Sequence, residues 1–401
     1  MKLEYLIAAL FILFGGVLIL YKSHGNKALK LLSFFLIVYM ARPIDDSHLV
    51  WAAELIFILS ISTFKASIIK DNRWYVLFVI FTVCSLFYSE DPIRGIPGLV
   101  MYVYPLFYYL LTIFAIKEME DAEKLFSSVS HHIWILIPLC ILSVYDKTLI
   151  FSYYGMGICT IPAYMFIKTK KKKYVFQLLI CLLPAFVLVK RTPLLGISVS
   201  MMIFSMLMYK WKAIIPSVLA VIIGIVIIVN VPSFRGKLFY DGDSVSISDF
   251  SRSGEIAEKV NVNGRLVFWS IVWDKYFQES PYLGAGQGSV KAYLQSDKNE
   301  YKMTFSLMHN DWLLILCEQG MIGVLLLLVF FGGLLRRCIK YSAKRYPRDL
   351  RLMSAACAGS VVSTMNHMFF ENCMNTFIVS TSFVFYALLN VYIRRYKIGL
   401  N

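Results

Sequence analysis

The chain has 401 residues, of which 58% are hydrophobic and only 16% are charged, and its formal net charge is +15. Soluble domains are about half apolar and about one quarter charged, so this composition excludes an ordinary water-soluble protein. The basic residues concentrate in short loops between apolar segments, as the positive-inside rule requires. Membrane topology therefore explains the positive charge better than a nucleic-acid partner does.

Apolar segments that approach the roughly 20 residues needed to cross a bilayer recur along nearly the whole chain. We expect about thirteen transmembrane helices, with twelve to fourteen as the range. They lie near residues 4–21, 28–41, 49–64, 74–88, 96–116, 129–145, 149–167, 174–189, 194–209, 213–230, 311–335, 352–372 and 375–393. Residues 4–21 lack a convincing cleavage site and are expected to stay as a helix. The sequence predicts an all-α polytopic membrane protein whose single bundle is formed by residues 1–230 and 311–401.

The charges of the loops predict the orientation of these helices. Lys168 with Lys170–Lys173, and the basic residues from Arg336 to Arg351, fall on one side of the expected bundle. The loops 190–193 and 372–375 carry less positive charge and fall on the other side. Because cytoplasmic loops collect lysine and arginine, we expect the C-terminus in the cytoplasm and residues 231–310 as a long loop outside.

This long loop is expected to hold an amphipathic helix. Its first part, Asp241–Ser253, is rich in serine, aspartate and glycine and is expected to be mobile. Large apolar residues then recur at spacings of three and four, as on one face of a helix. They are Phe268, Trp269, Val272, Trp273 and Tyr276. Pro281 and the glycine-rich run Gly284–Ser289 end this helix with turn chemistry. We expect it to lie on the membrane surface or to cap the bundle.

The eight cysteines lie in or at the ends of apolar segments, and none falls in the long loop. They are Cys84, Cys140, Cys159, Cys181, Cys317, Cys338, Cys357 and Cys373. This placement indicates small buried side chains rather than a disulfide framework or a zinc site. The chain also has no phosphate-binding glycine loop and no metal motif. No metal and no cofactor is therefore expected.

His309 is the first candidate for chemistry, because it stands where the long polar loop runs into an apolar helix. Asn310 or Asp311 is a natural N-cap for that helix. A helix N-terminus attracts anions through its unpaired N–H groups and its partial positive charge. A neutral histidine beside an anion site is suited to act as a general base. A structural histidine bonded to a loop carbonyl explains the residue equally well.

Arg191 is the second candidate and follows Lys190 on the side that otherwise avoids positive charge. The pair is suited to bind a phosphate, because guanidinium groups form two parallel hydrogen bonds with its oxygens. The alternative is an interfacial pair that reaches to lipid headgroups. Arg265, just before the aromatic stripe, is a third candidate and a possible second anion contact, although a solvated loop arginine is the usual finding.

Several further polar residues lie within apolar segments. Glu318 lies in the helix that follows His309, and a carboxylate inside a membrane is functional or partnered by default. A second group stands near the outer end of the segment 352–372 and consists of Asn366, His367, Glu371 and Asn372. We favour interhelical hydrogen bonds for both over the lining of a cavity. Gly320 and Gly323 are expected to permit close packing of helices.

The run from His309 to Gly323 resembles a signature of the bacterial O-antigen ligase and O-antigen polymerase superfamily. That signature is a His-Asn pair at the end of a large periplasmic loop, followed by Glu-x-Gly-x-x-Gly. Here it reads His309–Asn310 and Glu318–Gly323. Two further stretches are similar to the family pattern. They are Arg191 before two leucines, and Asn263–Arg265 followed by an aromatic helix and a Gly-x-Gly turn.

The resemblance implies metal-independent, inverting glycosyl transfer at the periplasmic face of the bacterial inner membrane. The donor would be an undecaprenyl-diphosphate-linked glycan and the acceptor a glycolipid, with a chain-length regulator as a further partner. Arg191, Arg265 and Lys190 would bind the diphosphate, and His309 would deprotonate the acceptor hydroxyl. Asn310, Asp311 and Glu318 would support the site.

Two alternatives to this reading remain open. A polymerase joins lipid-linked repeat units, whereas a ligase transfers finished chains to lipid A-core, and both use the same donor. We favour the polymerase, since the chain is compact and no lipopolysaccharide site stands out. A transporter or flippase is more distant. It predicts inverted repeats and broken helices near the midplane, of which the sequence shows no pair, and it leaves the long loop unexplained.

Overall fold

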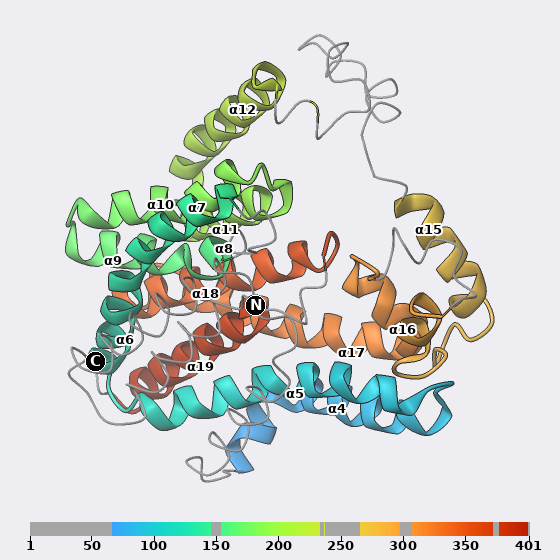
Figure 1. The fold of residues 1–401 in the computed structure, drawn as a ribbon. Coiled ribbons are helices and arrows are strands. Elements are labelled where there is room, and N and C mark those ends of the chain that lie inside the picture. Colours follow the sequence, from blue (N-terminus) through green and yellow to red (C-terminus); the bar gives the residue numbers. More distant parts are fainter. Residues whose placement is uncertain are drawn as a thin grey trace.

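The computed structural model describes residues 66–145, 154–232, 236, 265–296, 307–371 and 377–399. Every regular element in these ranges is a helix, so the all-α prediction is confirmed for this part of the chain (Figure 1). The helices expected at 4–21, 28–41 and 49–64, and the segment Asp241–Ser253, lie outside the described residues. The total of about thirteen helices therefore stays a prediction.

The described helices follow one another along the chain. They are α4 (Ala66–Ser85), α5 (Pro92–Ala115), α6 (Met119–His132), α7 (Leu136–Tyr145), α8 (Tyr154–Ile158), α9 (Thr160–Thr169), α10 (Lys173–Val187), α11 (Arg191–Tyr209), α12 (Ile214–Asn230), α15 (Arg265–Val272), α16 (Ser289–Leu294), α17 (Asp311–Tyr341), α18 (Arg348–His367) and α19 (Phe377–Lys397). Short 3-10 turns cover Leu86–Tyr88, Ile133–Ile135 and Lys210–Ala213, and a π-helical turn covers Trp273–Phe277.

Four stretches among the described residues are long and apolar enough to cross a membrane. They are Pro92–Ala115, Met119–Leu142, Arg191–Ala213 and Asp311–Tyr341. Lys173–Val187 is a shorter apolar helix. Each expected helix that falls within the described ranges coincides with helical residues. The chain thus has the helices of a multi-pass membrane protein.

Two of the expected helices are interrupted, and in both a proline explains the interruption. A proline has no N–H to bond the carbonyl four residues earlier. Pro138 leaves the Trp134 carbonyl without that bond, where a 3-10 turn separates α6 from α7. Pro162 does the same for Ile158, the last residue of α8. The spans expected near 129–145 and 149–167 are thus each divided by a turn, although Met119–Leu142 remains one stretch long and apolar enough to cross a membrane.

The core lies where α17, α18 and α19 pack against α4, α5 and α11. The ring of Tyr75 on α4 lies 5.1 Å from that of Phe330 and 4.6 Å from that of Phe383. On α18, an added Cβ at Gly359 would lie 2.8 Å from the Ser200 carbonyl oxygen of α11. Small residues of this kind let helices in a membrane approach closely.

A polar network closes the bundle at the end where α4 begins and where α17 and α19 end. Asp71 accepts hydrogen bonds from Arg394 and from the Tyr109 hydroxyl, at 2.5 and 3.0 Å. Arg337 donates to the Tyr386 hydroxyl, which donates to the Asp71 carbonyl. His309 and the start of α17 lie at the opposite end of the bundle.

At that opposite end, α17 is broken at Gly320, whose φ of 63° and ψ of −167° are not helical. In a continuous helix, the N–H groups of Met321 and Ile322 would bond the carbonyls of Cys317 and Glu318. Here Met321 and Ile322 donate instead to the carbonyls of Pro281 and Tyr282, at 2.8 and 3.3 Å.

The same loop also supplies donors for the released carbonyls of α17. The N–H groups of Ala285 and Gly286 donate to the carbonyls of Cys317 and Glu318, both at 2.9 Å. Residues 281–286 are thus inserted into the hydrogen-bond ladder of α17, and these two N–H groups and two carbonyls are bonded again. The expectation that Gly320 serves helix packing is wrong, since its close neighbour is the Tyr282 backbone of the loop.

The amphipathic helix of the long loop is present as α15 and the π-helical turn that follows it. Phe268, Val272 and Tyr276 are buried, Trp269 is partly buried, and Trp273 is exposed. The buried face therefore follows a spacing of four. It packs against α16, Met308 and Cys317, so the helix caps the site end of α17.

Candidate functional site

His309 faces a carboxylate at the end of α18. Its Nδ1 lies 2.8 Å from the Glu371 Oε2. Glu371 stands in the turn that follows α18, where its N–H donates to the His367 carbonyl. An ionised carboxylate can only accept a hydrogen bond, so Nδ1 carries the proton in this pair. In the neutral tautomer that carries its proton on Nδ1, the lone pair lies on Nε2, the nitrogen that a general base needs.

Arg265 reaches the same carboxylate from the start of α15. Its Nη1 donates to the Phe370 carbonyl at 3.0 Å, and its Nη2 lies 3.8 Å from the Glu371 Oε1. Glu371 therefore lies between a guanidinium and an imidazole, with one oxygen turned to each. The three side chains remain partly exposed, at 24% for Arg265, 19% for Glu371 and 30% for His309.

Arg191, the first residue of α11, lies within electrostatic range of this pair. It is half-buried and interacts with the charges of Arg265 and Glu371. The structure thus brings together Arg191, Arg265 and His309, which come from three separate parts of the chain, and Glu371 joins them. We call these four residues the site cluster.

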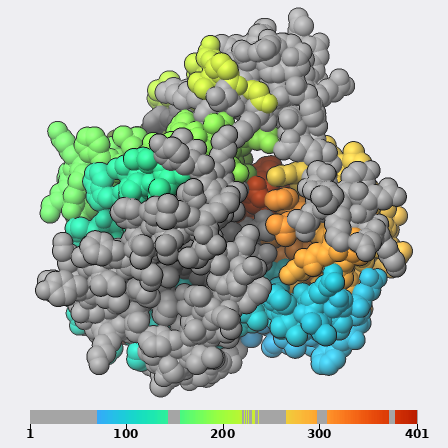
Figure 2. Space-filling view, viewed as in Figure 1, coloured from blue at the N-terminus to red at the C-terminus, as the bar shows by residue number. Residues whose placement is uncertain are grey.

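The space-filling view shows a recess between the elements that carry the cluster. In Figure 2, a recess lies between the green residues around α11 and the yellow and orange residues of α15 to α17, with red residues of the C-terminal part at its bottom. Arg191 and Arg265 begin the helices on either side of this recess.

The backbone around the cluster is fixed by hydrogen bonds. Asn310 caps α17 by accepting from the Leu313 N–H at 3.0 Å, which confirms the expectation that Asn310 or Asp311 would cap this helix. The Asp311 N–H donates to the Met368 carbonyl at 2.8 Å and ties the start of α17 to the end of α18. The Trp269 indole donates to the Met308 carbonyl at 2.9 Å and ties α15 to the residue before His309.

One residue of the site cluster and one beside it have strained backbones. His309 has a φ of 52° and Val189, two residues before Arg191, has a φ of 49°. Positive φ is unfavourable for non-glycine residues and most of all for a β-branched one, and it costs about 1–3 kcal/mol. Such strain concentrates at functional sites, where the surrounding structure holds a side chain in one orientation.

Glu371 lies in the turn after α18, and the groups around it determine the charge of its carboxyl. Burial acts to raise the pKa of its carboxyl, but the hydrogen bond from His309 and the charge of Arg265 outweigh burial. The pKa therefore lies below its ordinary value of 4.5. Glu371 is ionised at neutral pH and can accept from both neighbours.

This lowered pKa predicts a loss of stability in acid. A depressed carboxyl pKa stabilises the fold above the ordinary value, and the stabilisation disappears as the pH falls through the lower folded value. We expect the difference in melting temperature between the wild type and Glu371→Gln to shrink as the pH is lowered below 4.5. A difference that stays constant between neutral and acidic pH would contradict the ionised state of Glu371.

The structure does not bring two of the expected site residues into the cluster. The backbone N–H of Lys190 donates to the Ala185 carbonyl in the turn before α11, and its ammonium has no hydrogen bond or ion pair with the described residues. The Glu318 side chain is buried and accepts from the Val290 N–H at 3.2 Å, so it caps α16.

Glu371 is the residue whose place the sequence did not reveal. For the polar group that includes Glu371, the sequence predicts interhelical hydrogen bonds. No sequence pattern indicates that Glu371 pairs with His309, which lies 62 residues earlier in the chain. The available signal was its place at the outer end of an apolar segment, the same level as His309 and Arg191. A carboxylate near two arginines and a histidine in an apolar protein is a candidate partner for them.

Comparison with protein families gives a match over part of the chain. Residues 176–328 match the family described as O-antigen ligase, a range that includes Arg191, Arg265 and His309 and ends before Glu371. No curated protein matches the chain. Members of this family are membrane glycosyltransferases. The match confirms the resemblance of this chain to the O-antigen ligase and O-antigen polymerase superfamily.

Proposed function

We propose that this protein transfers a glycan from an undecaprenyl-diphosphate carrier to a second glycolipid at the periplasmic face of the bacterial inner membrane. One observation carries the proposal. Two arginines, a histidine and a carboxylate meet at one end of the bundle, and three of them lie in the segment that matches the O-antigen ligase family.

The chemistry of the transfer fits these side chains. The acceptor hydroxyl attacks the anomeric carbon, a new C–O bond forms, and the bond to the diphosphate oxygen breaks. The diphosphate leaves with the electron pair, and Arg191 and Arg265 stabilise its negative charge. His309 takes the hydroxyl proton on Nε2. Attack opposite the leaving group inverts the anomeric centre.

Glu371 supports the base in this proposal rather than touching the substrate. By accepting from Nδ1, it fixes the imidazole tautomer and orientation, as a carboxylate does for the histidine of a hydrolase triad. It also stabilises the imidazolium that forms when the proton is taken. Lys190 contributes less to binding in this proposal. It directly precedes Arg191 and acts only as a further positive charge near the diphosphate.

Polymerase and ligase activities share the donor and differ in the acceptor. We favour repeat-unit polymerisation, with ligation to lipid A-core as the alternative and the description of the matched family in its favour. A transporter is more distant. Broken helices line transport sites, and α17 is broken, but its released backbone groups are bonded to residues 281–286 instead of facing a cavity.

The decisive experiment incubates the purified full-length protein with a lipid-linked oligosaccharide, without metal or nucleotide. Longer lipid-linked glycans support a polymerase. Products that form only after lipid A-core is added support a ligase. If neither product forms and reconstituted vesicles instead move the lipid-linked glycan between leaflets, the transporter is the better reading.

Replacing Glu371 by glutamine should slow the transfer. The amide keeps the size of the side chain but removes the charge that stabilises the imidazolium and pairs with Arg265. We expect kcat to fall roughly 10–100-fold, as for other carboxylates that orient imidazoles. The measurement is the steady-state rate with saturating donor. Glu279→Gln, the same change at an exposed glutamate of the loop, should leave the rate unchanged, and equal losses in both variants would contradict the role of Glu371.

Replacing Arg191 by alanine should weaken the stabilisation of the leaving group. One donor to a developing negative charge contributes roughly 100-fold to the rate, and we expect a loss of about that size in kcat/KM. Arg94→Ala is the matched control, because Arg94 is an exposed arginine paired with Asp91 on α5. Lysine at position 191 should restore part of the rate. A wild-type rate in Arg191→Ala would remove this residue from the site.

A further inference from the structure

An apolar surface lies at the same end of the bundle as the site cluster. It is formed by the turn between α4 and α5 and by the loop before α16. Its members, which we call the apolar foot, are Phe87 (89% exposed), Tyr88 (44%), Ile93 (78%), Tyr282 (68%) and Leu283 (49%). Single exposed apolar residues are ordinary, but a group of large ones marks a surface that contacts a partner.

The two segments of the apolar foot form one surface. The Tyr88 hydroxyl donates to the Leu283 carbonyl at 2.9 Å. An added Cβ at Gly286 would lie 2.5 Å from the Ser89 Cα, and one at Gly288 would lie 2.6 Å from the Gly95 Cα. The two backbones are therefore in direct contact, and their exposed side chains keep a fixed arrangement.

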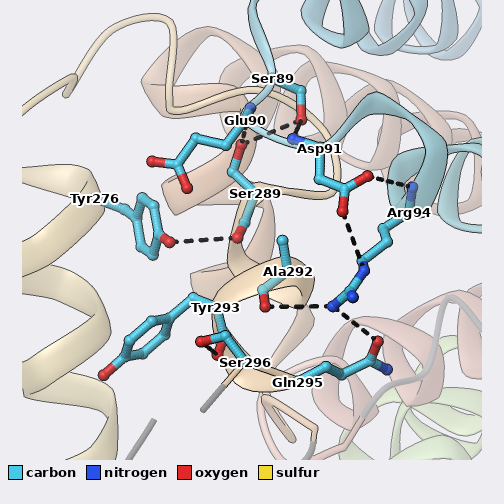
Figure 3. Close-up of polar contacts among 10 residues, drawn as sticks. All are labelled: Ser89, Glu90, Asp91, Arg94, Tyr276, Ser289, Ala292, Tyr293, Gln295 and Ser296. Atoms are coloured by element: carbon cyan, nitrogen blue, oxygen red, sulfur yellow. Dashed lines mark hydrogen bonds and ion pairs between the residues drawn. The ribbon is translucent and has the colours of Figure 1, made fainter. Parts of the chain in front are cut away.

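The polar groups of the same turn face the other way, towards α16. Figure 3 shows the side chains of Ser89, Asp91 and Arg94 turned to that helix, and the Glu90 carboxylate turned towards Tyr276. The Glu90 N–H donates to the Ser289 Oγ at 3.1 Å, and the Ser89 and Ser289 hydroxyls lie 3.2 Å apart. One side of the α4–α5 turn is thus polar and covered by α16, while the other is apolar and is not covered by any of the described helices.

The position of the apolar foot along the bundle axis can be measured from the polar network of Asp71 and Arg337 at the opposite end. Sixteen residues separate Asp71 from Phe87, and sixteen separate Met321, beside the foot, from Arg337. At 1.5 Å per residue both stretches rise about 24 Å, which approaches the roughly 30 Å of the hydrocarbon core. The foot therefore lies near the boundary between acyl chains and headgroups.

The surface between the two ends is apolar as well. Exposed apolar side chains between the two ends include Leu77, Ile80 and Val83 on α4, and Leu325, Leu328 and Val329 on α17. We expect a bilayer to cover these faces of α4 and α17. The foot continues this lipid-facing surface to its end and adds two tyrosines, the residues that collect at membrane interfaces because their rings are apolar and their hydroxyls polar.

We propose that the apolar foot rests in the phospholipid leaflet on the side of the site cluster, at the boundary between acyl chains and headgroups. The loop that carries α15 and α16 is thereby held by the bilayer, in addition to the hydrogen bonds that residues 281–286 form with α17. Its partner is the lipid surface itself.

The test uses spin labels on the full-length protein in vesicles of phosphatidylethanolamine and phosphatidylglycerol. Single cysteines replace Phe87 and Leu283 in a background where Cys84 and Cys373 are serine. Gln295→Cys, exposed directly after α16, serves as the control in water, and Leu325→Cys serves as the control in lipid. Each label is measured for collisions with oxygen, which concentrates in acyl chains, and with a water-soluble nickel chelate.

We expect the ratio of oxygen to nickel collisions at Phe87→Cys and Leu283→Cys to exceed that at Gln295→Cys several-fold and to approach that at Leu325→Cys. A ratio equal to that of Gln295→Cys would place the foot in water and overturn the proposal. Low collision rates with both reagents would mean that protein covers the foot, either another part of the chain or a second copy, and would also overturn it. No glycan substrate is present, so the result is independent of the transfer activity.

Discussion

Replacing His309 by alanine should lower the rate of glycosyl transfer by about two to four orders of magnitude, the contribution of a well-placed general base. The imidazole is the group whose Nε2 faces away from the Glu371 carboxylate, and without it no other ring nitrogen of the site cluster can take the acceptor proton. The rate should fall in kcat, since proton removal belongs to the chemical step. The measurement is single-turnover transfer with purified protein and a lipid-linked oligosaccharide.

Two further variants separate chemistry from folding. His309→Asn keeps a residue that tolerates a φ of 52° but has no basic ring nitrogen, so it should be as inactive as the alanine variant. His131→Ala removes an exposed histidine of α6, whose Nδ1 bonds the Ser127 carbonyl, and should keep the wild-type rate. Near-normal transfer by both His309 variants would show that the base lies elsewhere.

Replacing Gly320 by alanine should strongly destabilise the protein. Its φ of 63° with ψ of −167° is a conformation that essentially only glycine adopts, and an added Cβ would lie 2.2 Å from the Tyr282 carbonyl oxygen. Backbone strain and overpacking together should cost about 2–6 kcal/mol. We expect a large fall in melting temperature in detergent and a low yield of monodisperse protein.

Gly332→Ala provides the matched control on the same helix. Gly332 is exposed, nothing lies within 4 Å of its added Cβ, and its backbone is helical. Alanine is preferred over glycine by about 0.5–1 kcal/mol inside a helix, so this variant should be unchanged or slightly more stable. If Gly320→Ala melted like Gly332→Ala, the break in α17 would not be needed for the fold.

The elements that follow a local rule could be predicted from the sequence. The spacing of Phe268, Val272 and Tyr276 predicts a buried face, and these three residues are buried. The turn run Gly284–Ser289 has positive φ at three glycines. The lengths of the apolar segments predict where the long helices lie, although a turn near a proline divides two of them.

Features that depend on long-range contacts could not be predicted. The sequence places Glu318 in a membrane helix and favours interhelical hydrogen bonds for it. In the structure the Glu318 carboxylate caps α16, because the break in α17 at Gly320 brings the loop against this side chain. Nothing in the sequence of α17 indicates that its backbone groups form hydrogen bonds with residues 281–286. Likewise, Arg191 and Arg265 were recognised by residue type and position, whereas Glu371 was found only through its contacts in the folded chain.

The shared ladder of α17 has a consequence for biosynthesis. When residues 311–341 first enter the membrane, a continuous helix is the form that bonds all their backbone groups without help from elsewhere. With the loop orientation proposed above, the kinked form becomes acceptable only when residues 281–286 have crossed the membrane and dock beside Cys317 and Glu318. We therefore expect insertion to produce a straight segment first, and maturation of the protein to include a later bending step that couples the loop to the embedded helices.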